Sequence, residues 1–335
     1  MFTGWTHFTL KFKGVAIMKR TIKVIALGFA LATISTNTLH AGDTGKVGPI
    51  DFDISVGSEC MSGNTTFRIG YPVTEIGGLT YQGFFPFSEL KWPLDTWLAR
   101  VDLGVNIGKS ARINGTVKKN TTKPGRNMVD KAWITDSDPT QLDAYSESFN
   151  SDFSALIFDC DFEWVFLKNK SNRVYAGIGY QYQKFSYDSN LIHQYSPSGL
   201  PDFKDFYGDG SVSMTYDISY SMPYLILGGK HNISKHIAVA GSIAYSPYVS
   251  AHDKGMLLLE DRKLNGDMNG SAYMINVSST YTISSSLFIE CGMHYTKIIV
   301  DGTQTQSISG VPTSLVALDS KSSQTSGYLK IGYNF

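Results

Sequence analysis

Apolar and polar residues alternate with a period of two along several stretches of this chain. The clearest stretch has five apolar residues on one face and three acids on the other: Phe158, Cys160, Phe162, Trp164 and Phe166 against Asp159, Asp161 and Glu163. The stretches 51–56 and 97–107 follow the same rule. Because successive side chains of an extended strand point to opposite faces, these stretches predict strands with one apolar and one polar side. The pattern fits a soluble sandwich, whose charges face water, and also a membrane barrel, whose charges point inward.

The stretch 328–335 alternates in the same way and ends on an aromatic residue. Its apolar face consists of Leu329, Ile331, Tyr333 and Phe335. It resembles the closing strand of Gram-negative outer-membrane barrels, whose assembly machinery reads a terminal aromatic residue preceded by alternating apolar residues. The resemblance implies a protein of the bacterial outer membrane, with outer-membrane lipid and the barrel assembly machinery as partners.

Predicted turns and predicted long polar connections follow each other along the chain. The turns are 92–96, 168–172, 232–235 and 284–285, and the long connections are 63–83, 112–140, 189–211, 251–270 and 301–324. Short connections on one side and long ones on the other are typical of a membrane barrel, whereas a sandwich has no reason to sort them. The predicted strands are 50–62, 84–93, 97–110, 141–167, 173–188, 212–231, 236–250, 271–283, 286–300 and 325–335.

The predicted fold class is therefore all-β, a single ten-stranded antiparallel transmembrane β-barrel with long extracellular loops. The N-terminus carries an export pattern, in which Met18 is followed by Lys19, Arg20 and Lys23, an uncharged run over 24–34, and Leu39-His40-Ala41. This run is too short to span a bilayer as a helix, which needs ~20 residues. We expect 1–41 to be an N-terminal extension and signal peptide starting at Met18, and 42–335 to be the barrel.

Composition and motifs narrow the possible chemistry. The 335 residues carry a net charge of zero, so there is no electrostatic case for nucleic-acid binding. The sequence has no glycine-rich phosphate loop, no Cys/His cluster at metal spacing and no Gly-x-Ser-x-Gly motif, and we expect no cofactor and no metal. Cys60, Cys160 and Cys291 lie on apolar strand faces, which favours small apolar residues over disulfide partners, although an intermolecular disulfide stays open.

The polar faces predict a charged interior. The residues expected to point inward are Asp51, Asp53, Arg100, Asp102, Asp159, Asp161, Glu163, Glu290, His294 and Lys330. Ten strands enclose a lumen that side chains can fill, unlike the wide lumen of a 16-stranded porin. We expect a packed ionic network rather than a wide channel.

The segment Gly125-Arg126-Asn127-Met128-Val129-Asp130-Lys131-Ala132-Trp133 resembles the omptins, outer-membrane endoproteases whose corresponding loop reads Asn-Met-Val-Asp-x-Asp-Trp. Further short matches occur in the same order at 54–63, 88–92, 179–186, 222–224 and 245–249. The resemblance covers essentially the whole mature chain. It implies a ten-stranded barrel taller than the bilayer, which agrees with the strand count.

The omptin resemblance also implies catalytic positions, and most of them are not matched. Omptins use two acids in that loop and an Asp-x-His dyad opposite, which together position a water for attack on the peptide bond. Asp130 matches the first acid, but Ala132 stands where the second is expected. Counting without gaps from Tyr245 places the dyad on Gly255 and Leu257, neither of which can act as a base.

His252 and Asp253 are the candidates for a displaced dyad, although adjacent strand residues point to opposite faces. The resemblance further implies a lipopolysaccharide site on the outer wall, where Tyr180 and Lys184 match; both are also typical of an interfacial girdle. We expect an omptin-like barrel without omptin protease activity, in a surface-binding, adhesion or structural role. The alternatives are a narrow porin-like channel and an active endopeptidase with rearranged residues.

Overall fold

In the computed structural model of this chain, the described residues are 50–71, 74–76, 79–81, 84–108, 110–135, 138, 140–201 and 203–335. The chain divides into two compact units, Met1–Val47 and Gly48–Phe335, and the fold described below is that of the second. The predicted signal peptide and Met18 lie outside the described residues. Among the described residues, no helix has the length and apolar character that a membrane crossing requires.

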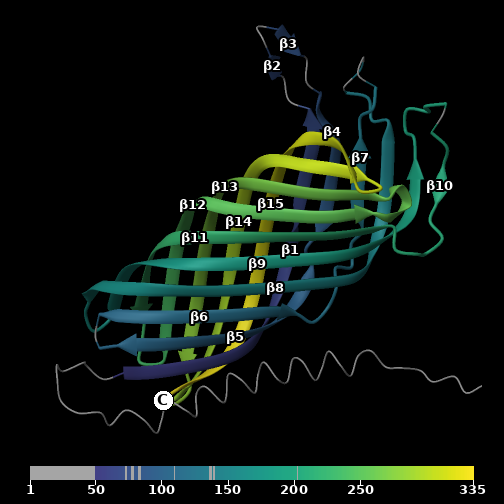
Figure 1. Ribbon diagram of the computed structural model, residues 1–335. Helices are drawn as coiled ribbons and strands as arrows, with labels where there is room; N and C mark the ends of the chain where they lie inside the picture. Colours follow the sequence, from purple (N-terminus) through teal and green to yellow (C-terminus); the bar gives the residue numbers. More distant parts are fainter. Residues whose placement is uncertain are drawn as a thin grey trace, which may run out of the picture. The chain divides into compact units, whose positions relative to one another are not determined.

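Antiparallel strands make up nearly all of the second unit (Figure 1). The long strands are β1 (Ile50–Tyr71), β8 (Ala144–Lys168), β9 (Asn172–Tyr195), β11 (Met214–Asn232), β12 (Ile237–Leu257), β13 (Arg262–Thr282), β14 (Leu287–Ile308) and β15 (Val311–Asn334). The shorter elements are β2 (Thr74–Ile76), β3 (Leu79–Tyr81), β4 (Phe84–Pro93), β5 (Thr96–Ile107), β6 (Ala111–Asn120), β7 (Met128–Ala132), β10 (Phe206–Tyr207) and the 3₁₀ helix η1 (Leu258–Glu260).

These strands close into a ring of ten positions, and the predicted ten-stranded antiparallel barrel is confirmed. The last strand, β15, pairs with β1 from Asp53↔Asn334 to Gly70↔Ala317, which joins the two ends of the sheet. On its other side β1 pairs with β5 near one barrel end and with β4 near the other. A closed ring leaves no strand edge with unpaired backbone groups, which is the condition for a sheet to span a membrane.

The predicted turn at 92–96 is wrong, because β4 and β5 are one interrupted strand. Both pair with β1 in a single register, with Asn64 opposite Pro93 and Met61 opposite Thr96. Pro93 and Asp95 resemble turn residues in the sequence. The alternation nevertheless continues through them, because Leu94 is fully buried inside the barrel.

Joining β4 and β5 leaves nine of the predicted strands in the ring. The tenth position is filled by β6 and β7, which lie within the predicted long connection 112–140. β6 pairs with β5 on one side and with β8 on the other, and β7 lies in the same way between β4 and β8. The predicted count of ten strands is correct, but the prediction divides one strand into two and omits another. The signal was present in the sequence, since Arg112, Asn114, Thr116 and Lys118 alternate with small or apolar residues.

Strand boundaries at the loop end of the barrel also differ from the prediction. We define the loop end of the barrel as the end that carries the connections 72–83, 133–143, 196–213, 258–261 and 309–310. The turn end is the opposite end, which carries Ile50 and Phe335. Most of the predicted loops 251–270 and 301–324 is strand. These parts were overlooked because their outward residues are polar, so that the apolar alternation of the lower wall ends there. Strands of 19 to 25 residues exceed the ~10 that cross hydrocarbon.

Exposed apolar side chains form a belt around the half of the wall nearer the turn end. They include Val56, Trp97, Leu103, Phe158, Phe162, Trp164, Phe166, Ile178, Leu225, Leu227, Ile243, Ile275, Val277, Met293, Leu329, Ile331 and Tyr333. Cys60, Cys160 and Cys291 lie on this outer face, as predicted, and are free thiols in this chain. Apolar residues outside and polar residues inside are the arrangement of a barrel wall in lipid.

The phase of this wall is testable by thiol labelling. In a background lacking Cys60, Cys160 and Cys291, we expect Phe162→Cys to react rapidly with a lipid-soluble maleimide in proteoliposomes. Asp161→Cys, one residue away, should react far more slowly, because its side chain points into the barrel. Unchanged migration of unheated protein on gels is the folding control for both variants. Faster labelling at position 161 than at 162 would contradict the assigned phase.

Candidate functional site

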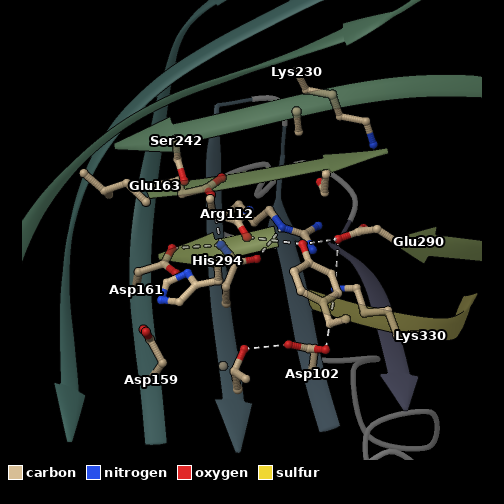
Figure 2. Close-up of a pocket in the computed structure, with 18 of the residues that line it drawn as sticks. Asp102, Arg112, Asp159, Asp161, Glu163, Lys230, Ser242, Glu290, His294 and Lys330 are labelled. Atoms are coloured by element: carbon tan, nitrogen blue, oxygen red, sulfur yellow. Dashed lines mark hydrogen bonds and ion pairs between the residues drawn. The ribbon is translucent and has the colours of Figure 1, made fainter. Parts of the chain in front are cut away.

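A polar cavity of about 380 Å³ occupies the interior of the barrel toward the turn end (Figure 2). Arg100 and Lys118 line it and belong to an ion-pair chain, in which Lys118 Nζ lies 2.8 Å and Arg100 Nη1 3.1 Å from the Glu59 carboxylate. Arg100 also contacts Asp102 at 2.8 Å, and Lys330 contacts Asp102 at 3.5 Å. Each of these five charges thus has a partner of opposite sign, which offsets the cost of burial in a low-dielectric interior.

The same network extends around the cavity wall. Arg112 pairs with Asp53 at 2.8 Å and Arg173 with Glu163 at 2.8 Å, while Tyr224 donates a hydrogen bond to Asp159. Of the acids predicted to point inward, Asp53, Asp102, Asp159, Asp161, Glu163 and Glu290 line this cavity, whereas Asp51 is exposed near the turn end. The prediction omits Arg112 and Lys118, because it places 112–140 in a loop, and it also omits Glu59, which lies within the predicted strand 50–62. Among the described residues no group of three or more His, Cys, Asp or Glu side chains could hold a metal ion.

An apolar cluster fills the barrel above this cavity, toward the loop end. Trp92 is fully buried and stacks on Tyr216, with ring centroids 5.1 Å apart. The ring of Tyr187 also packs against Trp92, with a centroid distance of 4.6 Å. Phe67 meets Tyr216 edge to face. Beside this cluster, a chain of buried hydrogen bonds runs from Asp159 through Gln181, Gln183, Gln324 and Ser322 to Thr65.

Asp130 lies on the inner face of β7, near the loop end and beyond the apolar belt. Ser88 Oγ donates a hydrogen bond of 3.1 Å to its carboxylate. Burial raises the pKa of Asp130 to about 6, and the carboxylate of Glu260 acts in the same direction against the hydrogen bond from Ser88. Ala132 follows two residues later on the same face, and its methyl group can neither hold nor activate a water.

The structure places His252 and Asp253 on opposite faces of β12 and does not bring them together. The His252 side chain is on the outer wall, where its Nδ1 contacts Asp267. Asp253 is fully buried inside, and its Oδ2 accepts hydrogen bonds from Tyr216 at 3.1 Å and Gln304 at 2.8 Å. Its other oxygen lies against Gly266, where any Cβ would collide with it.

Three comparisons with known proteins bear on this geometry. The family model described as the omptin family matches residues 82–331. The chain belongs to the omptin family. No curated protein sequence matches it.

A solved structure shares the fold. The outer-membrane protease OmpT from Escherichia coli has a TM-score of 0.67 at 19% identity, with 88% of this chain and 99% of that chain covered. The translocator domain of autotransporter NalP from Neisseria meningitidis, at 10% identity, covers 95% of this chain and 98% of that chain; its TM-score of 0.35 supports no further comparison. Family and fold together imply the bacterial outer membrane.

In this omptin-family barrel, Tyr180 and Lys184 both lie on the outer wall of β9. Tyr180 donates a hydrogen bond of 3.1 Å to Ser221 on the neighbouring strand, and Lys184 pairs with Asp217 at 3.2 Å. Both side chains face outward from the barrel wall. The lipopolysaccharide site stays a prediction.

The raised pKa of Asp130 predicts a pH-dependent effect on stability. The carboxyl binds its proton more tightly in the folded state, so its contribution to stability is full below the ordinary value of 3.8 and is lost as the pH rises to about 6. Asp130→Asn should therefore raise the midpoint of heat-induced unfolding at pH 8 by a few degrees and change it little at pH 4. Gel migration after stepwise heating measures this midpoint, and an equal gain at both pH values would contradict the assignment.

Proposed function

We propose that this omptin-family protein is an outer-membrane barrel without peptidase activity, whose extracellular end binds a ligand at the cell surface. The observation that carries the first part is the inner face of upper β12. Its inward residues are Val249, Ala251, Asp253, Gly255 and Leu257, and none of them can accept a proton as a histidine does. The ungapped count places the dyad on Gly255 and Leu257, and a dyad that began instead at Asp253 would have only a hydrogen atom at Gly255.

The other described histidines do not supply the missing base. His294 lies in the polar cavity and contacts Thr296 at 2.8 Å, on the far side of the apolar cluster from Asp130. His231 and His236 are exposed at the turn end. His193, on β9, is stacked against Tyr207 beside the β10 strand. A missing general base typically lowers a hydrolytic rate by ~10²–10⁴-fold.

The side chains that fill the barrel interior make the porin-like alternative unfavourable. The polar cavity holds paired charges, and the apolar cluster with Trp92, Tyr187 and Tyr216 lies between it and the loop end. An ion would have to pass a tightly packed layer whose buried polar side chains, among them Gln183, Gln324 and Ser322, already bond to one another. The structure favours a closed barrel.

An aromatic ridge at the loop end supports the binding role. We define the ridge as Tyr145, His193, Tyr195, Phe206 and Tyr207. Four of its rings pack in series, with centroid distances of 5.5 Å, 5.0 Å and 4.2 Å along Tyr145, Tyr195, His193 and Tyr207; the first pair is tilted and the other two are stacked. Phe206 and Tyr207 remain 48% and 68% exposed. Exposed aromatic groups on ordered connecting segments are typical of binding surfaces.

A hydrogen-bonded clamp orders the connections next to the ridge. The carboxylate of Asp143 accepts hydrogen bonds from the backbone N–H groups of Ile134 and Thr135, and from Ser198 Oγ at 2.8 Å. Asp143 thus joins the connection 133–143 to the connection 196–213. The surface beside them is held in one arrangement before a ligand arrives, which lowers the entropy that binding must overcome.

Peptidase assays test the first part of the proposal. The refolded protein, with lipopolysaccharide added, should cleave dibasic fluorogenic peptides no faster than buffer, and Ala132→Asp alone should not change this. The Asp130→Asn variant serves as the matched control for any residual signal. Cleavage by the unmodified protein that disappears in Asp130→Asn would overturn the proposal and make the chain an active endopeptidase.

Ligand arrays test the second part. Barrel protein in lipid nanodiscs should bind one or more components of a glycan and peptide array, and the double change Phe206→Ala and Tyr207→Ala should abolish that binding. Tyr281→Ala, an exposed aromatic residue at the turn end, is the control and should bind like the unmodified protein. Absence of any binding that depends on Phe206 and Tyr207 would refute the role of the ridge.

A further inference from the structure

Three side chains on the outer wall form the hydrogen-bond pattern of a serine hydrolase triad. Ser250 Oγ lies 3.2 Å from His252 Nε2, and His252 Nδ1 lies 2.5 Å from Asp267 Oδ1. Ser250 and His252 are two residues apart on the outer face of β12, and Asp267 is directly opposite His252 on β13. A register that pairs His252 with Asp267 therefore builds the arrangement from two adjacent strands.

One tautomer of His252 satisfies both contacts. With the proton on Nδ1, the ring donates to Asp267, and Nε2 is free to accept the proton of the Ser250 hydroxyl. This is the assignment of roles that defines a nucleophile, a general base and an orienting acid, and it recurs on unrelated folds in different chain orders. Nδ1 thus contacts the acid and Nε2 contacts the hydroxyl, as in a serine hydrolase triad.

The position of the three residues on the wall indicates the substrate class. On the turn-end side they are followed by Tyr245, Tyr248 and Tyr273, which are 42%, 57% and 49% exposed, and then by the apolar residues Ile243 and Ile275. Tyrosines at the margin of an apolar belt mark the membrane–water interface. The side chains of His252 and Asp267 are 57% and 69% exposed, so a molecule in the surrounding lipid layer has access to them.

We propose that Ser250, His252 and Asp267 hydrolyse acyl esters of lipids in the outer leaflet. Ester bonds of a lipid lie between its acyl chains and its polar headgroup, and therefore at the interface where Ser250 is found. Asn269 lies opposite Ser250 on β13 and is exposed on the same face, which makes its side-chain amide the candidate donor to the developing oxyanion. The site depends on placement of the barrel in the outer membrane and is separate from the aromatic ridge and from peptidase activity.

The reaction consumes one water for each ester. Ser250 Oγ attacks the ester carbonyl carbon while its proton passes to His252 Nε2, and Asp267 stabilises the imidazolium through Nδ1–H. The carbon–oxygen bond to the lipid alcohol breaks, and the alcohol leaves with the proton from His252. A water then attacks the acyl-serine and transfers a proton to His252; the bond to Oγ breaks, the proton returns to Ser250, and a fatty acid is released.

Fatty-acid release from proteoliposomes tests the proposal. One set of vesicles contains ester phospholipids only, and a second contains lipopolysaccharide in non-hydrolysable ether phospholipids, which separates the two possible sources of the ester. We expect release from at least one set, measured by mass spectrometry. Ser250→Ala and His252→Ala should each lower the rate by about 10³-fold or more, and Asp267→Asn by roughly 10²–10⁴-fold.

Labelling provides a second measurement that does not depend on the lipid. A fluorophosphonate reagent should modify Ser250 in the folded, detergent-solubilised protein and should fail to do so in His252→Ala. Ser323→Ala, an outward serine on β15, and His236→Ala at the turn end are the matched controls and should behave like the unmodified protein. All variants are first checked for folded migration on unheated gels.

The outcomes separate this proposal from the preceding one. No release from either set of vesicles, release that persists in Ser250→Ala, or labelling of a serine other than Ser250 would each overturn the triad. None of these results bears on ligand binding by the aromatic ridge. Peptide cleavage, in turn, would leave the triad untouched, because the peptidase positions lie on the inner face of the barrel.

Discussion

The pairing of β15 with β1 is the constraint on which the rest of the structure depends. Lipid offers no hydrogen-bond partners to a backbone, so each N–H and C=O group within the apolar belt must be satisfied inside the sheet. A run of pairs from Asp53↔Asn334 to Gly70↔Ala317 removes the two edges that an open sheet would have. Once the ring is closed, every strand has one face toward the lumen and one toward lipid or water.

Closure also fixes how the interior is filled. A ring of ten strands is too narrow for a wide water column, so side chains meet across it. Toward the turn end they are charged, and Glu59, Arg100 and Lys118 form pairs because isolated charges there would be strongly unfavourable. Toward the loop end they are aromatic and aliphatic, and Trp92 and Tyr216 stack inside. The same wall therefore holds a polar cavity and a sealing cluster, one above the other.

Strand geometry also separates two kinds of chemistry on β12. His252 and Asp253 are neighbours in sequence, but one faces outward to Asp267 and the other inward to Tyr216 and Gln304. The inner face keeps an acid without a base, and the outer face combines a serine, a histidine and an acid. In this member of the omptin family, the residues suited to proton transfer thus lie on the side of the barrel wall opposite to the peptidase positions that the family resemblance implies.

The sequence by itself determined the fold class, the phase of the clearest strands and most of the inward acids. A wall between an apolar belt and a polar lumen imposes a period of two, and the stretch Phe158–Phe166 follows that period at every position. The sequence also determined that Ala132 cannot replace an acid. The tertiary structure alone decided which strands are continuous, since Pro93 and Asp95 resemble a turn until their pairing with β1 is seen. It likewise decided the contact between His252 and Asp267, which are 15 residues apart. That contact depends on the register between two strands, and local alternation contains no information about the residue that a neighbouring strand places opposite.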